Sequence, residues 1–332
     1  MTRLAACATF LLSALYAGAV AAQPITMEAA VTGGHSSEEA ASAAATQLRA
    51  FGDVGPRIHV YAEAAWGTTT DDDVDAFGAA YPYHNRPQIV ETYAERMFRP
   101  RGAILGIKGG RYRMPFGIYA ASDQSYNGFL RPPLMRYDGY FSISNNFLEQ
   151  GADLIAGVPR FTVEAAVGAP ADIGSVHRRS GVDTVARAQA YAGPFIAGVS
   201  YVRTEPYQSP IFAHGQAEFG GFDLRFSYAG VELRGELIDG RPFNGTKTVG
   251  WYADAMVHRV GMGPVTLLAR VEDIAYETAP PFNMHGRRQT VGARVRILQP
   301  LAFQVNAVHQ SGEPAEYGAA ALDVALTNTV RR

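Results

Sequence analysis

The chain has 332 residues, a formal net charge of -2 and a mean hydropathy of -0.06. Its length suffices for one large β-domain or for two domains of ordinary size. The balanced charge excludes the polycationic surface that attracts nucleic acids or anionic membranes, so we expect no nucleic-acid partner. No internal stretch is apolar enough for a membrane-spanning helix.

Residues 1–22 have the pattern of a secretory signal peptide. Arg3 precedes an apolar run, and small residues lead to an expected cleavage after Ala22. An uncleaved anchor helix is the alternative. The sole cysteine, Cys7, lies before the expected cleavage point, so the mature chain is expected to contain no disulfide. An exported chain of this kind is not a small disulfide-stapled domain.

Residues 23–55 differ in composition from the rest of the chain. We expect a short helix here, capped by Ser36 or Ser37 and ended by Gly52, because Glu38 and Glu39 suit the positive end of a helix dipole. The segment is therefore predicted to be a partly helical N-terminal extension on the periplasmic side or a plug within a pore.

From residue 56 onward, apolar and polar residues alternate as in β-strands. In one example, Phe161, Val163 and Val167 share one face, and Thr162 and Glu164 share the other. A soluble sheet shows the same alternation on its surface, so the pattern predicts strands without deciding what covers them. A secreted or surface β-sandwich binding module is accordingly one alternative for the whole protein.

The connections between these strands alternate between short and long. Short connections are expected at 99–102, 158–159, 192–194, 229–230, 261–264 and 298–300, and long ones at 68–86, 114–149, 170–181, 204–211, 240–247, 277–286 and 311–317. This rhythm predicts about fourteen strands with both chain ends on the short-turn side, or sixteen if 114–149 contains another hairpin. It is typical of an all-β fold, a transmembrane antiparallel up-and-down β-barrel of about 14–16 strands over residues 56–332. Such a barrel lies in the bacterial outer membrane, in contact with lipid and lipopolysaccharide.

If the apolar face of the strands meets lipid, the charged face lines a water-filled lumen. We predict an outer-membrane porin that lets small hydrophilic solutes or ions diffuse passively. The balance of inward charges does not favour a strongly single-sign pore. The residues predicted to line the pore are Lys108, Arg111, Arg113, Arg187, Arg225, Arg234, Arg270, Arg294, Arg296, Glu232, Glu236 and Asp254.

The stretch GIKGGRYRMPFG, residues 106–117, combines a strand pattern with three cations. An inserted residue at Gly109-Gly110 would turn Lys108, Arg111 and Arg113 into the lumen and leave Tyr112 outside at the rim. Pro115 is expected to end the strand, and Phe116-Gly117 to turn the chain into a constriction loop. We expect the long segment 114–149 to fold into the barrel and narrow it; an external, surface-packed loop is the alternative.

The same stretch carries a family likeness. GRYRMPFGIY, residues 110–119, resembles the Gly-basic-x-basic-x-Pro-Phe-Gly segment of bacterial porins in the phosphate-selective porin O and P group. The resemblance covers mainly residues 86–165, and it implies a passive diffusion channel that assembles as a homotrimer. Two features depart from that group. Lysine occurs only at 108 and 247, so phosphate selectivity is not expected, and the sequence ends Thr329-Val330-Arg331-Arg332 rather than on an aromatic residue.

No motif for catalysis, cofactor binding or metal binding stands out. None of the eight histidines lies in a metalloprotease or nucleophile-elbow pattern, so we expect no catalytic residue and no cofactor. An outer-membrane barrel enzyme acting on lipid is the remaining alternative. The acidic run 71–75 lacks the glycine and the closing glutamate of a calcium loop, so no metal is expected.

Overall fold

A computed structural model of the chain describes residues 25–55, 57–70, 87–121, 128–136, 148–171, 181–204, 217–241, 247–277, 284–312 and 320–332. The expected signal peptide, residues 1–22, and the acidic run 71–75 lie outside the described residues. Within the described ranges, no helix is long and apolar enough to cross a membrane.

Sixteen β-strands and three short 3-10 turns make up the described chain. The strands are β1 (Thr26–Ser36), β2 (Ser42–Val54), β3 (Ile58–Thr69), β4 (Gln88–Phe98), β5 (Ile104–Arg113), β6 (Leu148–Val158), β7 (Phe161–Pro170), β8 (Asp183–Ala192), β9 (Phe195–Thr204), β10 (Ala217–Tyr228), β11 (Val231–Arg241), β12 (Lys247–Val257), β13 (Val265–Glu277), β14 (Met284–Arg296), β15 (Leu301–Gly312) and β16 (Ala320–Arg331). The 3-10 turns are η1 (Glu38–Ala40), η2 (Leu134–Arg136) and η3 (Val260–Met262).

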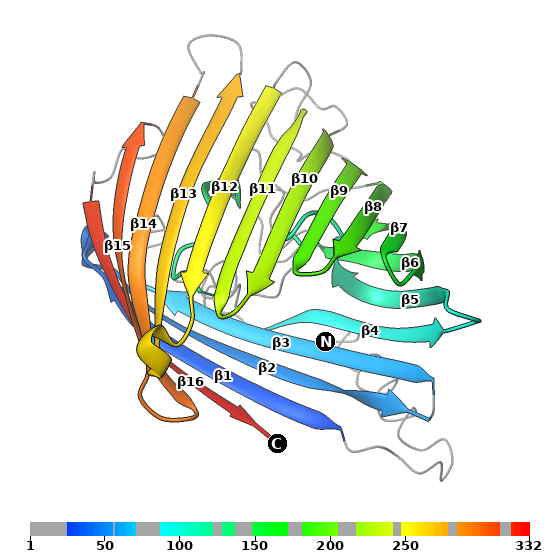
Figure 1. The fold of residues 1–332 in the computed structure, drawn as a ribbon, viewed down its shortest axis with the longest axis horizontal. Helices are drawn as coiled ribbons and strands as arrows, with labels where there is room; N and C mark the ends of the chain where they lie inside the picture. The colour runs from blue at the N-terminus through cyan, green and yellow to red at the C-terminus, as the bar shows by residue number, and fades with distance from the viewer. Residues whose placement is uncertain are drawn as a thin grey trace.

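Each strand pairs antiparallel with its neighbours in sequence, and β1 pairs with β16 to close the ring. Figure 1 shows this up-and-down order, and short turns join the described strands at one end of the barrel. The closing register joins Glu28 to Arg331 and Ser36 to Asp323. The predicted all-β antiparallel barrel is therefore confirmed. Both described chain ends lie together on the short-turn side, where Met27 and Arg332 exchange two backbone hydrogen bonds.

The prediction for residues 23–55 is wrong. They form no helical plug or extension: β1 and β2 occupy most of the segment, and only residues 38–40 make a 3-10 turn. The fourteen strands expected after residue 56 are all present, and the two additional strands come from this segment rather than from 114–149. The physical reason is that β1 pairs with β16 and β2, and β2 also pairs with β3, so both strands gain ladder hydrogen bonds on two sides; this outweighs the helix preference of an alanine-rich stretch.

The two faces of the barrel wall have opposite character. Large apolar side chains such as Leu154, Val199 and Phe222 are exposed on the outside. Acidic side chains one position away in the strands, such as Asp153 and Asp223, are buried on the inside. This distribution is the reverse of a water-soluble domain, which buries its apolar residues and exposes its charged ones.

The predicted inserted residue at Gly109-Gly110 is also wrong. The register of β5 runs unbroken against both β4 and β6. The bulge lies instead in β4, because Glu63 of β3 faces Glu91 while Ala64 faces Ile89, which leaves Val90 as the extra residue. Tyr112 is not at an outer rim: its side chain is 1% exposed and belongs to the buried cluster inside the barrel.

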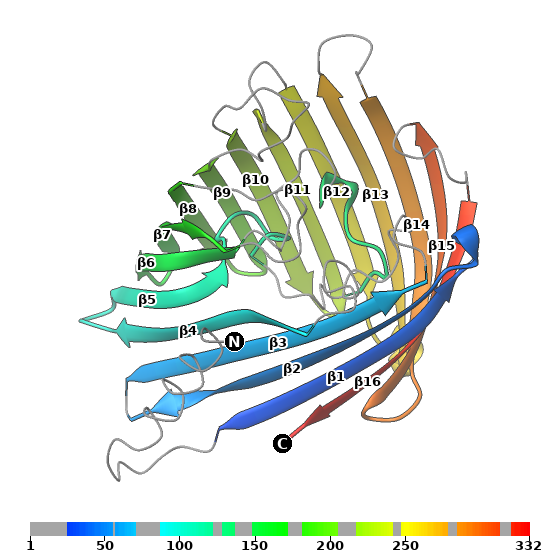
Figure 2. The same cartoon turned by 180° about the vertical axis from the view of Figure 1, so that it is seen from behind.

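Two described parts of the segment between β5 and β6, here called the inserted segment, lie inside the ring of strands. They are residues 114–121, called the first limb, and residues 128–136, called the second limb. Figures 1 and 2 show the second limb, with η2, surrounded by the barrel wall in both views. Met114, Phe116, Ile118 and Tyr119 of the first limb are buried in an apolar cluster with side chains from β7 to β12. This cluster fills part of the lumen near its long-loop end.

Candidate functional site: the charged interior and the inserted segment

A network of ion pairs follows the inner wall from β8 to β14. Arg187 of β8 pairs with Asp223 of β10 at 3.0 Å, and Arg225 lies 4.0 Å from the same carboxylate. Further along, Asp254 of β12 accepts from Arg270 of β13 at 2.6 Å and lies 3.5 Å from Arg234 of β11.

The network continues beyond these strands. Arg234 also lies 3.4 Å from Glu232, and Arg288 of β14 pairs with Glu272 of β13 at 2.7 Å. Six of the residues predicted from the sequence to line the pore take part in these ion pairs: Arg187, Arg225, Arg234, Arg270, Glu232 and Asp254. Because most of these cations have an acidic partner in contact, the wall here is polar but close to neutral.

A second charged group occupies β3 to β7. Lys108 lies 2.7 Å from Asp153 and 3.4 Å from Glu164, above the ring of Tyr112. Arg113, the last residue of the same strand, donates to Glu63 at 2.8 Å.

Arg113 also donates to Glu91, which lies directly opposite Glu63 in the β3–β4 register. The guanidinium therefore offsets the repulsion between two facing carboxylates. Arg111 is half-buried, and its Nε donates to the Val90 carbonyl at 3.0 Å, so it is bound along the neighbouring strand.

The first limb is fixed by one carboxylate of β11. The backbone N–H groups of Ile118 and Tyr119 donate to Oε2 of Glu236 at 3.1 and 3.0 Å, and the Tyr252 hydroxyl donates to the same atom at 3.1 Å. Glu236 is thus a structural anchor rather than a free charge facing water.

Local conformation brings the first limb to this anchor. Pro115 follows the end of β5, and Gly117 adopts a φ of 55°, a left-handed conformation that favours glycine. A Cβ added at Gly117 would collide with the Glu236 carboxylate. The Phe116 ring packs over Gly221 of β10, where an added Cβ would stand 2.8 Å from the ring. Glycine is therefore needed on both sides of this contact.

The second limb is bound to β13, β14 and β15, mostly through its backbone. The N–H of Leu134 donates to Glu272 at 2.6 Å, and Arg270 donates to the carbonyl of residue 131 at 3.1 Å. Arg288 donates to the Pro132 carbonyl, and Gln304 reaches the carbonyl of residue 128. Side chains of the wall therefore hold this limb without requiring a particular side chain on it.

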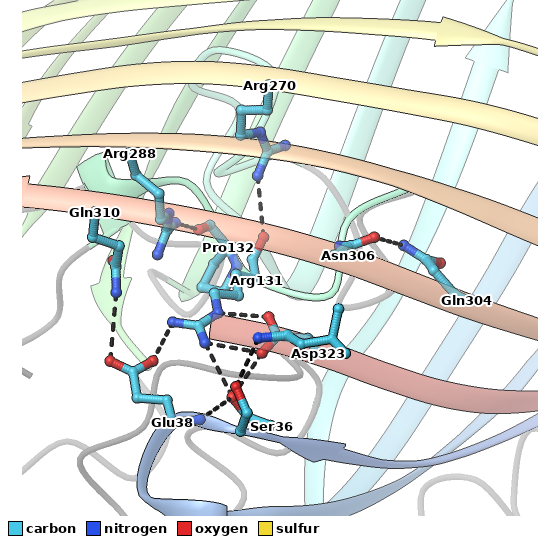
Figure 3. Close-up of polar contacts among 12 residues, drawn as sticks. Ser36, Glu38, Arg131, Pro132, Arg270, Arg288, Gln304, Asn306, Gln310 and Asp323 are labelled. Carbon is cyan, nitrogen blue, oxygen red and sulfur yellow. Dashed lines mark hydrogen bonds and ion pairs between the residues drawn. The ribbon is translucent and has the colours of Figure 1, made fainter. Parts of the chain in front are cut away.

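The exception is Arg131, whose side chain crosses to the seam where the barrel closes. Figure 3 shows its guanidinium between Asp323 of β16 and the Ser36–Glu38 turn. Nε and Nη2 donate to the Asp323 carboxylate at 2.6 and 2.9 Å, Nη1 donates to Glu38 at 2.5 Å, and Nη2 also donates to the Ser36 hydroxyl at 3.1 Å. We call these four residues the seam clasp.

The seam clasp keeps Arg131 charged. Burial alone lowers the pKa of this guanidinium, but the hydrogen bonds and charge of Asp323, with those of Glu38, raise the pKa above its ordinary value. The guanidinium therefore remains a cation at every pH at which the protein is handled.

Arg294 and Arg296 of β14 lie apart from the ion-pair network. They line a cavity of about 670 Å³ toward the short-turn end of the barrel, together with Arg259, His258 and Gly128. Among the described residues, no carboxylate forms an ion pair with Arg259, Arg294 or Arg296.

Sequence reasoning missed the seam clasp. The four residues of the seam clasp lie on three segments that are far apart in the chain, and no spacing in the sequence connects them. From the sequence, Ser36 or Ser37 is expected to cap a helix and Glu38 to lie at its positive end, which uses the same polar character for a different local structure. In the part of the chain that the structure describes, no group of three His, Cys, Asp or Glu side chains is placed to hold a metal ion.

Comparison with known proteins gives a likeness in fold only. No protein-family model matches the chain, and no curated protein matches it by sequence. Among solved structures, it is similar to OmpF of Salmonella typhi in a complex with daunomycin, with 11% identity, a TM-score of 0.66, and coverage of 92% of this chain and 97% of that one.

An anion-selective porin from Comamonas acidovorans gives 11% identity, a TM-score of 0.64, and coverage of 92% of this chain and 99% of that one. The outer-membrane channel DcaP of Acinetobacter baumannii gives 8% identity, a TM-score of 0.61, and coverage of 92% of this chain and 96% of that one. The chain therefore has the sixteen-stranded barrel fold that these outer-membrane porins and channels share, across nearly its whole described length.

Proposed function

We propose that the protein is a porin of the bacterial outer membrane that admits small hydrophilic solutes by passive diffusion. The observation that carries the proposal is the inverted distribution of side chains: apolar residues cover the outside of a closed barrel, and paired charges cover the inside. Hydrocarbon tolerates such a wall because closure leaves no strand edge with unpaired backbone groups. Lipid and lipopolysaccharide are then the partners of the outer surface.

In this proposal the inserted segment sets the bore. Both limbs are buried against the wall, one held by Glu236 and the other by β13 to β15 and the seam clasp. Lys108, Arg111, Arg113 and the wall arginines shape the local field beside it. No side chain performs a chemical step, so the protein is proposed to have no enzymatic activity.

Two finer proposals concern assembly and family. We propose a homotrimer, supported by a trimer form among the structural neighbours, an outer-membrane protein OmpT of Vibrio cholerae. Cross-linking in detergent, with and without heating, tests the trimer. The resemblance of residues 110–119 to the phosphate-selective porin O and P group stays a prediction. The small number of lysines argues against carrying phosphate selectivity over.

Planar-bilayer recording tests the proposed function directly. The purified mature protein, added in detergent, is expected to produce stepwise conductance increments in KCl and a folded band of altered mobility in unheated gels. A freely soluble monomer that gives no increments and binds no detergent micelles would contradict the proposal. A β-sandwich binding module would behave in that way.

A further inference from the structure

One cavity at the short-turn end of the lumen is lined by three arginines and, among the described residues, by one carboxylate. Arg294 and Arg296 are two residues apart on β14, so their side chains share the inward face, with Val295 between them turned outward. Arg259, in the turn that carries η3, lines the same cavity. Three guanidinium groups therefore surround one space of about 670 Å³.

The negative charge in this cavity already has partners, Arg234 and His258. Among the described residues, Glu232 is the sole carboxylate that lines the cavity; it lies 3.4 Å from Arg234 and 3.4 Å from Nε2 of His258. His258 also reaches the Thr266 hydroxyl at 3.4 Å, which fixes its ring between the two partners. With three arginines and one carboxylate, the lining carries a formal charge of 3 − 1 = +2 with His258 neutral.

The rest of the lumen behaves differently. From β8 to β14 nearer the middle of the wall, each of Arg187, Arg270 and Arg288 has a carboxylate within 3.0 Å. Placing like charges on one strand face without such partners is unfavourable unless an anion joins them. Guanidinium groups bind carboxylate and phosphate oxygens in pairs of parallel hydrogen bonds, so the missing partner suits a small anion.

The cavity also has an apolar side. Met256 and Leu268, both buried, line it together with the backbone of Gly128 from the second limb and of Gly263 and Pro264. Inorganic phosphate has no apolar part to bury against these surfaces, whereas burying the carbon skeleton of an organic anion there is favourable. Gly128 of the inserted segment lines the cavity, and the other lining residues include Arg259, Gly263 and Pro264 of a short turn.

We propose that this cavity is a binding subsite for small organic dicarboxylates, held by Arg294 and Arg296 with Arg259 at the mouth. Because the inference rests on the proposed pore, the subsite would act as the last contact of a permeating anion before it leaves the short-turn end. A charged group of the anion replaces the absent carboxylates, and its hydrocarbon part lies along Met256 and Leu268.

The test uses the full mature chain in detergent micelles, with succinate as the probe, in two independent measurements. Isothermal titration calorimetry measures binding without requiring a channel. Bilayer recording measures the reduction of the chloride current when succinate is added on the short-turn side. The variant is the double substitution Arg294→Gln and Arg296→Gln, and the charge-matched control is Arg99→Gln with Arg160→Gln, two exposed arginines in other turns at the same end.

We expect saturable succinate binding to the wild type and to the control, and at least about tenfold weaker binding to the double variant, since each lost charged hydrogen bond accounts for about that factor or more. Inorganic phosphate should bind more weakly than succinate. Equal binding by the double variant and the wild type, or phosphate binding as tight as succinate, would overturn the proposal.

The two measurements separate this inference from the proposed function. If the protein binds succinate through Arg294 and Arg296 but gives no current in KCl, the proposed subsite is supported and the proposed pore is contradicted. If the protein conducts in KCl but binds no succinate, the proposed pore is supported and the proposed subsite is contradicted. Heat-modifiable gel mobility of each variant verifies that the barrel has folded.

Discussion

Replacing Arg131 by alanine tests whether the seam clasp holds the inserted segment in the lumen. The substitution removes four hydrogen bonds from a side chain whose residue is only 3% exposed, and leaves the Asp323 carboxylate buried with Ser36 as its remaining partner. Loss of one partner from a buried ion pair typically costs about 3–5 kcal/mol. At about 1.4 kcal/mol per factor of ten, the equilibrium constant that favours the wall-bound second limb falls by a factor of about a hundred or more.

The assay is a double-mutant cycle. Free energies of unfolding in urea are measured in lipid vesicles for the wild type, Arg131→Ala, Asp323→Ala and the double variant. The double variant should be more stable than the sum of the single effects predicts, with a coupling of about 1–3 kcal/mol. Arg287 and Asp273, an ion pair whose arginine is 67% exposed, serve as the matched control with a coupling of about 0–1 kcal/mol.

Single-channel recording completes the test. Arg131→Ala should raise the mean conductance and the current noise, because the second limb gains freedom to leave the wall. A coupling below about 0.5 kcal/mol together with unchanged conductance would show that the clasp does not position the segment.

Alkaline pH offers an independent check on the same contact. The pKa of Arg131 in the folded protein lies above its ordinary value, so the stabilisation is complete at any pH below that ordinary value. It would be lost only as the pH rose through the still higher folded pKa. The difference in unfolding free energy between wild type and Arg131→Ala should therefore be the same at pH 7.5 and pH 10. A difference that shrinks across this range would contradict the assignment.

Two further substitutions test the first limb and the outer face. Glu236→Ala leaves the buried N–H groups of Ile118 and Tyr119 without their acceptor, at about 1–3 kcal/mol each. The temperature at which the folded band disappears from gels should fall, less so for Glu236→Gln, which keeps one acceptor oxygen; equal effects would argue against the anchor. Leu154→Arg, at an outward position 58% exposed in the middle of β6, should reduce folding into vesicles by about 2–4 kcal/mol if that face meets lipid, whereas Tyr228→Arg at a strand end should cost about 0–1 kcal/mol. Equal effects at the two positions would place neither in a bilayer.

The sequence allowed the strands to be found because alternation survives wherever one face is apolar and the other charged. β7 shows this clearly, with Phe161, Val163 and Val167 outward and Glu164 inward. β2 lacks the contrast: alanines stand on both faces, at Ala43 and Ala44 for example, so a period of two is hidden and helix preference remains as the visible signal.

Which charges meet was beyond the sequence, because pairing depends on the register between strands. Arg270 joins Asp254 because the two are directly opposite in the β12–β13 register, and a shift by one residue would turn one of them outward. The inward position of each residue follows from strand parity alone. The contacts of Arg131 join it to residues far away in the chain, and no local pattern specifies such contacts.

The bulge in β4 was missed for a related reason. A glycine pair at 109–110 suggested an irregular strand at the right level of the barrel, but the extra residue is Val90 in the adjacent strand. Val90 is an ordinary strand residue, and nothing in its neighbourhood marks an insertion. The glycine at 110 nevertheless has a special backbone, with a φ of 135°.

The position of the seam clasp links one attachment of the second limb to the closure of the barrel. The hydroxyls of Thr32 and Thr327 meet at 3.1 Å across the seam although 295 residues separate them, so this pairing closes the longest loop in the protein. The entropy lost in joining such distant parts is recovered only when the neighbouring strands are in place. Arg131 contacts residues on both sides of that junction, so these hydrogen bonds of the second limb can form only after the first and last strands have joined.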